Sequence, residues 1–142
     1  MNILFSSKSP MPDKVLSNMA YTKLWYKGIM FTSAEQAFQW AKCVTDEDRQ
    51  KVLSEENPFE CRKIGRHVKL LPTWEQDKLA IMAEILVAKF SAPKCKEILL
   101  QTGDSPLYHL SPWDLYWGVN EHLNGDNYLG MILHRIRENL RG

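Results

Sequence analysis

One stretch of the chain constrains its structure most, because it combines a helix start with an aligned set of polar side chains. It reads Phe31-Thr32-Ser33-Ala34-Glu35-Gln36-Ala37-Phe38-Gln39-Trp40-Ala41-Lys42. Thr32 and Glu35 have the spacing of a capping box, in which a hydroxyl and a carboxylate each cover an unpaired backbone N–H. Glu35, Gln39 and Lys42 then fall at i, i+4 and i+7 and share one helix face. We interpret this polar stripe as one wall of a cleft; alternatively, Glu35 is only a cap residue and Lys42 only a surface cation.

Length and composition predict a single domain, residues 1–142. The chain has 142 residues, of which 44% are hydrophobic and 25% charged, as in ordinary globular proteins with a sizeable core. Its net charge is +1. No field of the whole protein therefore attracts nucleic acid, and any contact with DNA or RNA has to be local.

The positions of the cysteines, histidines and apolar residues argue against a metal site, a disulfide framework, a membrane-spanning segment and a signal peptide. The three cysteines are far apart and form no CxxC pair, and the four histidines lack metal-ligand spacing, so we expect no metal, cofactor or disulfide framework. No apolar run reaches membrane-spanning length, and residues 1–5 do not begin a signal peptide. We expect a monomer in the cytosol of a bacterium or, for a viral gene, of its host.

Hydrophobic periodicity predicts a mainly helical α+β protein with about six helices and a few short strands. Residues 2–5 are expected to form a strand, and residues 22–31 a hairpin that turns at Lys27-Gly28. Start signals and apolar stripes predict helices over 32–43, from Thr45, from Asn57-Pro58, over 72–90, over 93–100 and over 127–140. The longest of these, over 72–90, is the expected central core helix.

Two further stretches are unusual. The densest basic cluster is Arg62, Lys63 and Arg66, which is either a phosphate clamp or a solvated helix face. Residues 108–120 place four aromatic side chains, an acid and a glycine in a Pro-containing loop with at most short strands. After this loop, Gly125 allows close approach of the backbone to a ligand, and the following helix start is expected to offer free N–H groups to an anion.

Seven short elements, in order, resemble one known family over nearly the whole chain. They are Leu16-Ser17-Asn18; Ser33-x-Glu35-x-x-Phe38-Gln39-x-x-Lys42; Pro58 with Ile64-Gly65-Arg66; Trp74 with Met82 and Lys89-Phe90; Leu99-Leu100-x-Thr102-Gly103-Asp104; Ser111-x-x-Asp114-x-x-Trp117-Gly118; and Gly125-x-Asn127-x-Leu129-Gly130 with Arg137. On these residues the chain resembles the NADAR family, also called YbiA-like. The resemblance implies the YbiA-like fold and N-glycosidase activity.

The resemblance also implies a substrate that contains ADP-ribose or a ribosyl phosphate. Family members remove ADP-ribose from guanine bases in DNA or cleave riboflavin-pathway ribosyl intermediates, so ADP-ribosylated DNA is one expected partner. Two alternatives belong to other classes of function. One is a non-catalytic module that binds ADP-ribose or NAD, and the other is a phage or bacterial interaction protein that keeps only the fold.

The expected catalytic residues are Glu35, Lys42 and Asp114. Cleavage of an N-glycosidic bond builds positive charge on the ribose, and a carboxylate can stabilise that charge or activate water. Glu35 is the first choice for this carboxylate and Asp114 the second. Three roles stay open for Lys42: to protonate the leaving base, to bind phosphate, or to attack the anomeric carbon as an amine, which requires a lowered pKa.

The matching elements also supply a set of expected substrate-binding residues. Trp117 is expected to stack on the base or cover the ribose, and to share one pocket with Glu35 and Lys42. The set is Asn18, Phe38, Gln39, Arg66, Trp117, Gly118, Gly125 and Asn127. The chain departs from the family pattern at His109, where relatives tend to carry an acid, and at Asn120, where they carry Gly. If the acid at the first of these positions contacts the substrate, its replacement by His109 favours a different base or a different working pH.

Overall fold

The computed structural model describes residues 1–142 and divides them into two compact units. We call Asn18–Lys89 the helical unit, and Met1–Ser17 together with Phe90–Gly142 the terminal unit. The chain forms six α-helices, one short 3-10 helix and four short strands. This composition confirms the predicted mainly helical α+β class. None of the helices is both long enough and apolar enough to cross a membrane.

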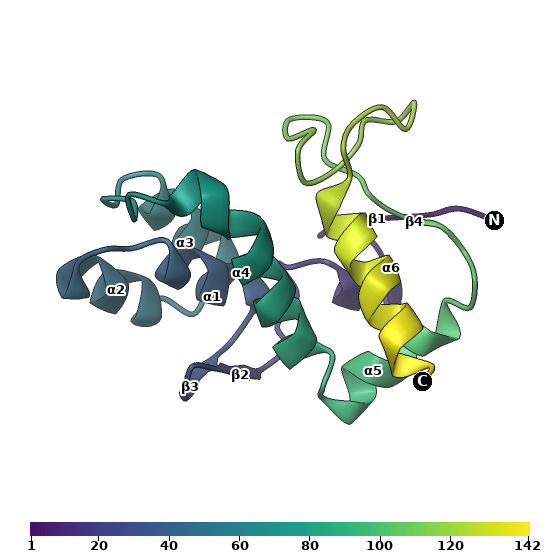
Figure 1. Ribbon diagram of the computed structural model, residues 1–142, viewed down its shortest axis with the longest axis horizontal. Helices are drawn as coiled ribbons and strands as arrows, with labels where there is room; N and C mark the ends of the chain where they lie inside the picture. The colour runs from purple at the N-terminus through teal and green to yellow at the C-terminus, as the bar shows by residue number, and fades with distance from the viewer. The chain divides into compact units, whose positions relative to one another are not determined.

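The helical unit contains one hairpin and four helices (Figure 1). Strands β2 (Leu24–Tyr26) and β3 (Ile29–Phe31) pair antiparallel, with Trp25 opposite Met30. Lys27 and Gly28 turn the chain with φ angles of 53° and 77°, as a two-residue hairpin loop requires. The predicted hairpin is therefore confirmed. The helices are α1 (Ala34–Ala41), α2 (Asp46–Leu53), α3 (Pro58–Gly65) and α4 (Trp74–Lys89).

Helix α1 packs against α2, α3 and α4 and is the centre of the helical unit. Part of its core is formed by Cys43, Val52 and Cys61, which are fully buried beneath Trp40. Burial raises the pKa of the Cys43 thiol to about 11 and that of the Cys61 thiol to about 12. Because the thiolate is the reactive form, these cysteines serve as inert core residues. Helix α4 buries Met82, Ile85, Leu86 and Lys89, so its buried face is not purely apolar.

The start of α1 corrects the predicted capping box by one residue. The N-cap is Ser33, whose hydroxyl accepts the N–H of Gln36 at 3.0 Å. The Gln36 side chain in turn accepts the N–H of Thr32 at 2.8 Å and donates to the carbonyl of Glu55 at 2.8 Å. Glu35 is therefore not the residue that closes the box. The prediction was wrong because Ser33 and Gln36 have the same spacing as Thr32 and Glu35, and sequence alone does not choose between these registers.

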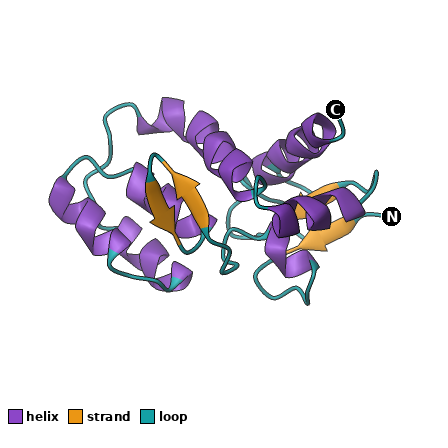
Figure 2. Cartoon of the chain, turned by 90° about the horizontal axis from the view of Figure 1, so that it is seen from below, coloured by secondary structure: helices purple, strands orange, loops and turns teal.

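In the terminal unit, a strand near the N-terminus pairs in parallel with a strand more than a hundred residues later in the sequence. In β1 (Ile3–Phe5) and β4 (Leu107–His109), Ile3 lies opposite Leu107 and Phe5 opposite His109. Figure 2 shows this sheet and the β2–β3 hairpin in orange. The remaining elements are the 3-10 helix η1 (Asp13–Leu16), α5 (Pro93–Gln101) and α6 (Tyr128–Leu140).

Helix α6 fixes the turn between α5 and β4. The Arg137 guanidinium is buried and donates to Thr102 Oγ1 at 2.9 Å and to the Ser105 carbonyl at 2.8 Å. The same helix packs on β4. After β4 the chain forms an irregular loop with one bridge between Leu110 and Val119, which confirms the predicted loop with short strands.

The revised cap makes a prediction about stability. Ser33→Ala removes the acceptor of the Gln36 N–H and should lower the free energy of unfolding by about 1 kcal/mol, whereas Ser33→Gly should lower it by only about a few tenths. Urea unfolding of the two variants beside the parent measures this difference. An Ala variant as stable as the parent would contradict the assignment of Ser33 as the cap.

Candidate active site

Glu35 is a buried carboxylate held from two sides. It is the second residue of α1, and its side chain is 9% exposed. The Gln39 side-chain amide donates to Glu35 Oε1 at 2.8 Å, and Arg62 Nε on α3 lies 3.6 Å from the same oxygen. Because a buried charge is costly unless it is paired and hydrogen-bonded, these two contacts explain how the carboxylate is accommodated. The polar stripe of α1 is therefore not a solvated face.

Gly65 at the end of α3 lets α3 approach this stripe closely. A β-carbon placed on Gly65 would lie 1.8 Å from Gln39 Oε1 and 3.0 Å from Lys42 Cε. Any other side chain would therefore displace the Gln39 amide. Gly65 belongs to the Ile64-Gly65-Arg66 element, and its role is to admit two side chains of α1.

Lys42 ends α1 and is half-buried. Burial lowers the pKa of its amine, and the Arg66 guanidinium lowers it further, while Glu35 and Cys43 act in the opposite direction. Lys42 and Arg66 each form no ion pair in the structure, in contrast to Arg62 and Lys63, which pair with Glu35 and Glu60. A lowered pKa and the absence of a counter-ion are properties that an amine nucleophile, a proton donor or a phosphate ligand would use.

Asn18, the first residue of the helical unit, is hydrogen-bonded to α1. Its carbonyl accepts the N–H of Glu35 at 3.1 Å, and its side-chain amide lies 3.4 Å from Met82 Sδ. The Asn18 Oδ1 atom is buried without a hydrogen-bond partner. Such atoms are uncommon in native proteins, and a ligand is one way to satisfy them. Phe38 packs on Trp74 with ring centroids 5.0 Å apart.

Asp114 organises the aromatic loop of the terminal unit. Its Oδ1 atom accepts the backbone N–H groups of Tyr116 and Trp117, both at 3.2 Å. Trp117 is half-buried, and its ring packs on the Tyr116 ring in a T-shaped arrangement with centroids 4.8 Å apart. Asp114 therefore holds the backbone that carries Trp117, and a catalytic role for it stays a prediction.

Gly118 and Gly125 bring backbone segments of this loop together. A β-carbon on Gly125, whose φ is 142°, would lie 2.2 Å from the Gly118 carbonyl oxygen, and one on Gly118 would lie 2.4 Å from the His109 carbonyl oxygen. Both positions therefore require glycine for the packing of the loop itself. Their predicted contact with substrate stays a prediction.

Asn127 joins the start of α6 to β4. Its Oδ1 accepts the N–H of His109 at 3.0 Å, and its Nδ2 donates to the Leu107 carbonyl at 3.0 Å. The residue is buried and has a left-handed backbone with φ of 54°. These contacts use the side chain to position β4, so its predicted bond to substrate stays a prediction.

The expectation of free N–H groups at the start of α6 is wrong for its first residues. The N–H groups of Asn127, Tyr128 and Leu129 donate to the carbonyl groups of residues 118, 116 and 117, at 3.2, 3.1 and 3.1 Å. The loop backbone thus occupies the donors that an anion would use. The sequence could not reveal this, because the pairing depends on how residues 116–118 fold over the helix end.

The two departures from the family pattern have visible structural roles. His109 stacks on Phe5 with a centroid distance of 5.4 Å. Asn120 Oδ1 accepts the N–H groups of His122 and Asn124 at 2.9 and 3.0 Å, which closes a turn. The Asn side chain therefore stabilises this turn through hydrogen bonds that glycine could not supply.

In the helical unit, the structure brings together Glu35, Gln39, Lys42 and Asn18, with Arg66 close enough to influence Lys42. Sequence reasoning did not assign Arg62 and Gly65 to the site, although both stood in stretches that it had singled out. The missing information was which face of α3 packs on α1. That Asp114 and Trp117 of the terminal unit join this cluster stays a prediction.

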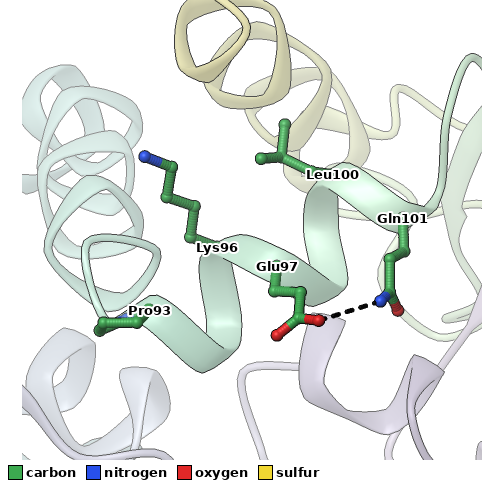
Figure 3. A pocket seen from close by; sticks show the side chains of 5 residues that line it. All are labelled: Pro93, Lys96, Glu97, Leu100 and Gln101. Atoms are coloured by element: carbon green, nitrogen blue, oxygen red, sulfur yellow. Dashed lines mark hydrogen bonds between the residues drawn. The ribbon is translucent and has the colours of Figure 1, made fainter.

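A separate surface hollow lies on α5. Its lining residues are Pro93, Lys96, Glu97, Leu100 and Gln101, all from that one helix, and Figure 3 shows Gln101 hydrogen-bonded to Glu97. It contains none of the predicted site residues. We therefore take the α1–α3 cluster as the candidate site.

Several known proteins are similar to this chain, among them the following three. Protein irg-1 of Caenorhabditis elegans is 29% identical over 80% of this chain and 63% of its own length. The chloroplastic riboflavin biosynthesis protein PYRR of Zea mays is 35% identical over 66% of this chain and 16% of its own length. The chain thus spans less than two thirds of these two relatives. N-glycosidase YbiA of Escherichia coli K12 is 30% identical over 87% of this chain and 79% of its own length.

The solved structure of YbiA from E. coli has the same fold. It superposes with a TM-score of 0.87 over 99% of this chain and 87% of the YbiA chain, at 27% identity. The NADAR domain model matches residues 4–141. The match covers nearly every residue from β1 to the end of α6, so the chain belongs to the NADAR domain family.

Proposed function

We propose that the protein is an N-glycosidase that hydrolyses a ribose N-glycosidic bond. The observation that carries the proposal is the buried Glu35 carboxylate, held by Gln39 and Arg62 beside a Lys42 whose pKa is lowered. A buried carboxylate beside an amine whose pKa is lowered by burial is a combination typical of catalytic sites. Two of the similar proteins support the reaction class by name: YbiA is an N-glycosidase and PYRR acts in riboflavin biosynthesis.

The proposed reaction breaks the bond between the ribose C1′ and the base nitrogen. As the bond breaks, its electron pair leaves with the base and positive charge develops on the ribose ring. Glu35 stabilises that charge and accepts a proton from the water that attacks C1′, so that a free ribose hydroxyl forms. The departing base nitrogen takes up one proton. In total, the reaction adds one water molecule across the C1′–N bond. Asp114 is the second candidate for the carboxylate.

Lys42 keeps three candidate roles. As an ammonium it protonates the departing base or binds a phosphate; as a neutral amine it attacks C1′, and water then releases the sugar. Rise per residue places the α-carbons of Glu35 and Lys42 roughly 10–11 Å apart along the helix axis. A ribose-sized group therefore fits between the ends of the two side chains. Arg66, which has no acidic partner, is the candidate for binding phosphate.

The proposed substrate contains ADP-ribose or a ribosyl phosphate. ADP-ribose linked to guanine in DNA and riboflavin-pathway ribosyl intermediates both offer the required bond and phosphate. The net charge of +1 favours a small footprint on any DNA. Trp117 is proposed to stack on the base, and Asn18 Oδ1, which is buried without a partner, to accept a ribose hydroxyl. The monomeric state and the cytosolic location stay predictions.

Incubation with two substrates tests the proposal. The protein is mixed with DNA that carries ADP-ribosyl guanine and, separately, with the amino-ribose phosphate intermediate of riboflavin synthesis. Mass spectrometry should detect free ADP-ribose in the first mixture or free base in the second. Glu35→Gln should slow the reaction by a factor on the order of a hundred or more, because it removes the charge that stabilises the transition state.

Stability and affinity of the Glu35→Gln protein serve as controls. Its melting temperature and its affinity for the substrate should stay near those of the parent, because Gln retains an acceptor for Gln39 and uniform binding does not depend on the charge. A parent that binds ADP-ribose but releases no product would support the non-catalytic binding module instead. A Glu35→Gln protein as active as the parent would shift the assignment to Asp114.

The pH dependence distinguishes the roles of Lys42. Arg66→Gln removes a cation that lowers the pKa of the Lys42 amine, so that pKa should rise. If the neutral amine attacks C1′, kcat/KM rises with pH through this pKa, and the rising limb moves to higher pH in the variant. If the ammonium protonates the base, kcat/KM falls through this pKa, and the falling limb moves to higher pH. Exposed Lys69→Gln is the control, and identical profiles for Arg66→Gln and the parent would exclude both roles.

A further inference from the structure

The two groups that hold Glu35 act on the same oxygen. Gln39 donates to Oε1 from one turn along α1, and the Arg62 Nε atom approaches Oε1 from α3. Neither contact involves Oε2. At its far end, the Arg62 Nη2 atom donates to Met19 Sδ at 3.4 Å. The carboxylate therefore has one oxygen attached to the protein and a second oxygen that these contacts leave available.

We propose that Gln39 and Arg62 are positioning residues for Glu35, which fix Oε1 so that Oε2 faces the substrate, and that Gly65 provides the space in which Gln39 does this. The inference rests on the proposed function, because it assigns roles within the same reaction. It also revises the expectation for Gln39, which now acts through Glu35 rather than by binding the substrate. Arg62, which the sequence alone groups with Lys63 and Arg66 as a basic cluster, is here interpreted as part of the site.

The geometry around Gly65 explains why this role needs glycine. Gln39 is buried, and its Oε1 atom lies 1.8 Å from where a Gly65 β-carbon would be. Gln39 Oε1 also has no hydrogen-bond partner, so the amide is held by its bond to Glu35 and by its contact with α3. A methyl group at position 65 would meet the far end of a flexible side chain rather than backbone. The protein should therefore still fold, with the Gln39 amide moved away from Glu35.

A pair of coupled substitutions tests this role of Gly65. Gly65→Ala should lower kcat by about tenfold or more with little change in KM, because a catalytic group displaced by a fraction of an ångström loses alignment while binding persists. Gln39→Ala should have a similar effect. In the Gln39→Ala background, Gly65→Ala should lower kcat much less, since the closest group it displaces is gone and only Lys42 Cε, 3.0 Å from the added β-carbon, still has to shift slightly. If the double variant instead loses kcat by the product of the two single-variant factors, the role of Gly65 is overturned.

Charge substitutions on α3 test the role of Arg62. Arg62→Gln should lower kcat by about tenfold or more with KM nearly unchanged, and Arg62→Lys should restore part of the rate because it returns a cation beside Oε1. The matched control is Lys63→Gln, which removes one positive charge from the next position on the helix, where Lys63 is exposed and pairs with Glu60. Circular dichroism and melting temperature show whether each variant is folded.

The outcomes separate this inference from the proposed function. If the parent releases product and Arg62→Gln behaves like Lys63→Gln, the positioning role is overturned while the N-glycosidase proposal stands. If Arg62→Gln is folded and raises KM with kcat unchanged, Arg62 binds substrate and the positioning role is again overturned. A parent that hydrolyses neither ADP-ribosyl guanine DNA nor the amino-ribose phosphate would overturn both proposals.

Discussion

The close approach of α3 to α1 is the constraint on which the candidate site depends. It is possible because Gly65 has no side chain where Gln39 and Lys42 lie. The same approach brings Arg62 to within 3.6 Å of the Glu35 carboxylate. One missing methyl group thus allows the acid and the amide of α1 to be buried, and the amine to be half-buried, against a helix that supplies Arg62 as the counter-charge of Glu35. Without that packing the stripe would be an ordinary solvated helix face.

Capping and the proposed catalytic role belong to different residues of α1. Ser33 and Gln36 satisfy the helix start, and Gln36 also links α1 to the segment that follows α2 by donating to the Glu55 carbonyl. Glu35, one position away, is released from capping and is available for chemistry. In the terminal unit, by contrast, Asp114 and Asn127 use their side chains to hold loop and strand backbone. This difference favours Glu35 over Asp114 as the catalytic carboxylate.

Local sequence signals predicted the elements well and the contacts between elements poorly. The hairpin at Lys27-Gly28 and the helix starting at Asn57-Pro58 depend on turn and cap chemistry within a few residues, and both are confirmed. The shared face of Glu35, Gln39 and Lys42 followed from helix periodicity alone. The Arg62–Glu35 pair, the space at Gly65 and the covered start of α6 arise from packing between distant segments, which no local pattern encodes. The capping box failed for a different reason, because two registers fitted equally well.

The central claim is that the Glu35 carboxylate acts on the ribose of the substrate. A crystal structure of the Glu35→Gln protein with unhydrolysed substrate measures this most directly. The account predicts that the side chain at position 35 contacts the ribose near C1′, with Gln39 and Arg62 directed to its other side. The same structure would show whether Trp117 and Asp114 contact the ligand. A ribose bound away from position 35, with the α1–α3 cluster untouched by ligand, would contradict the account.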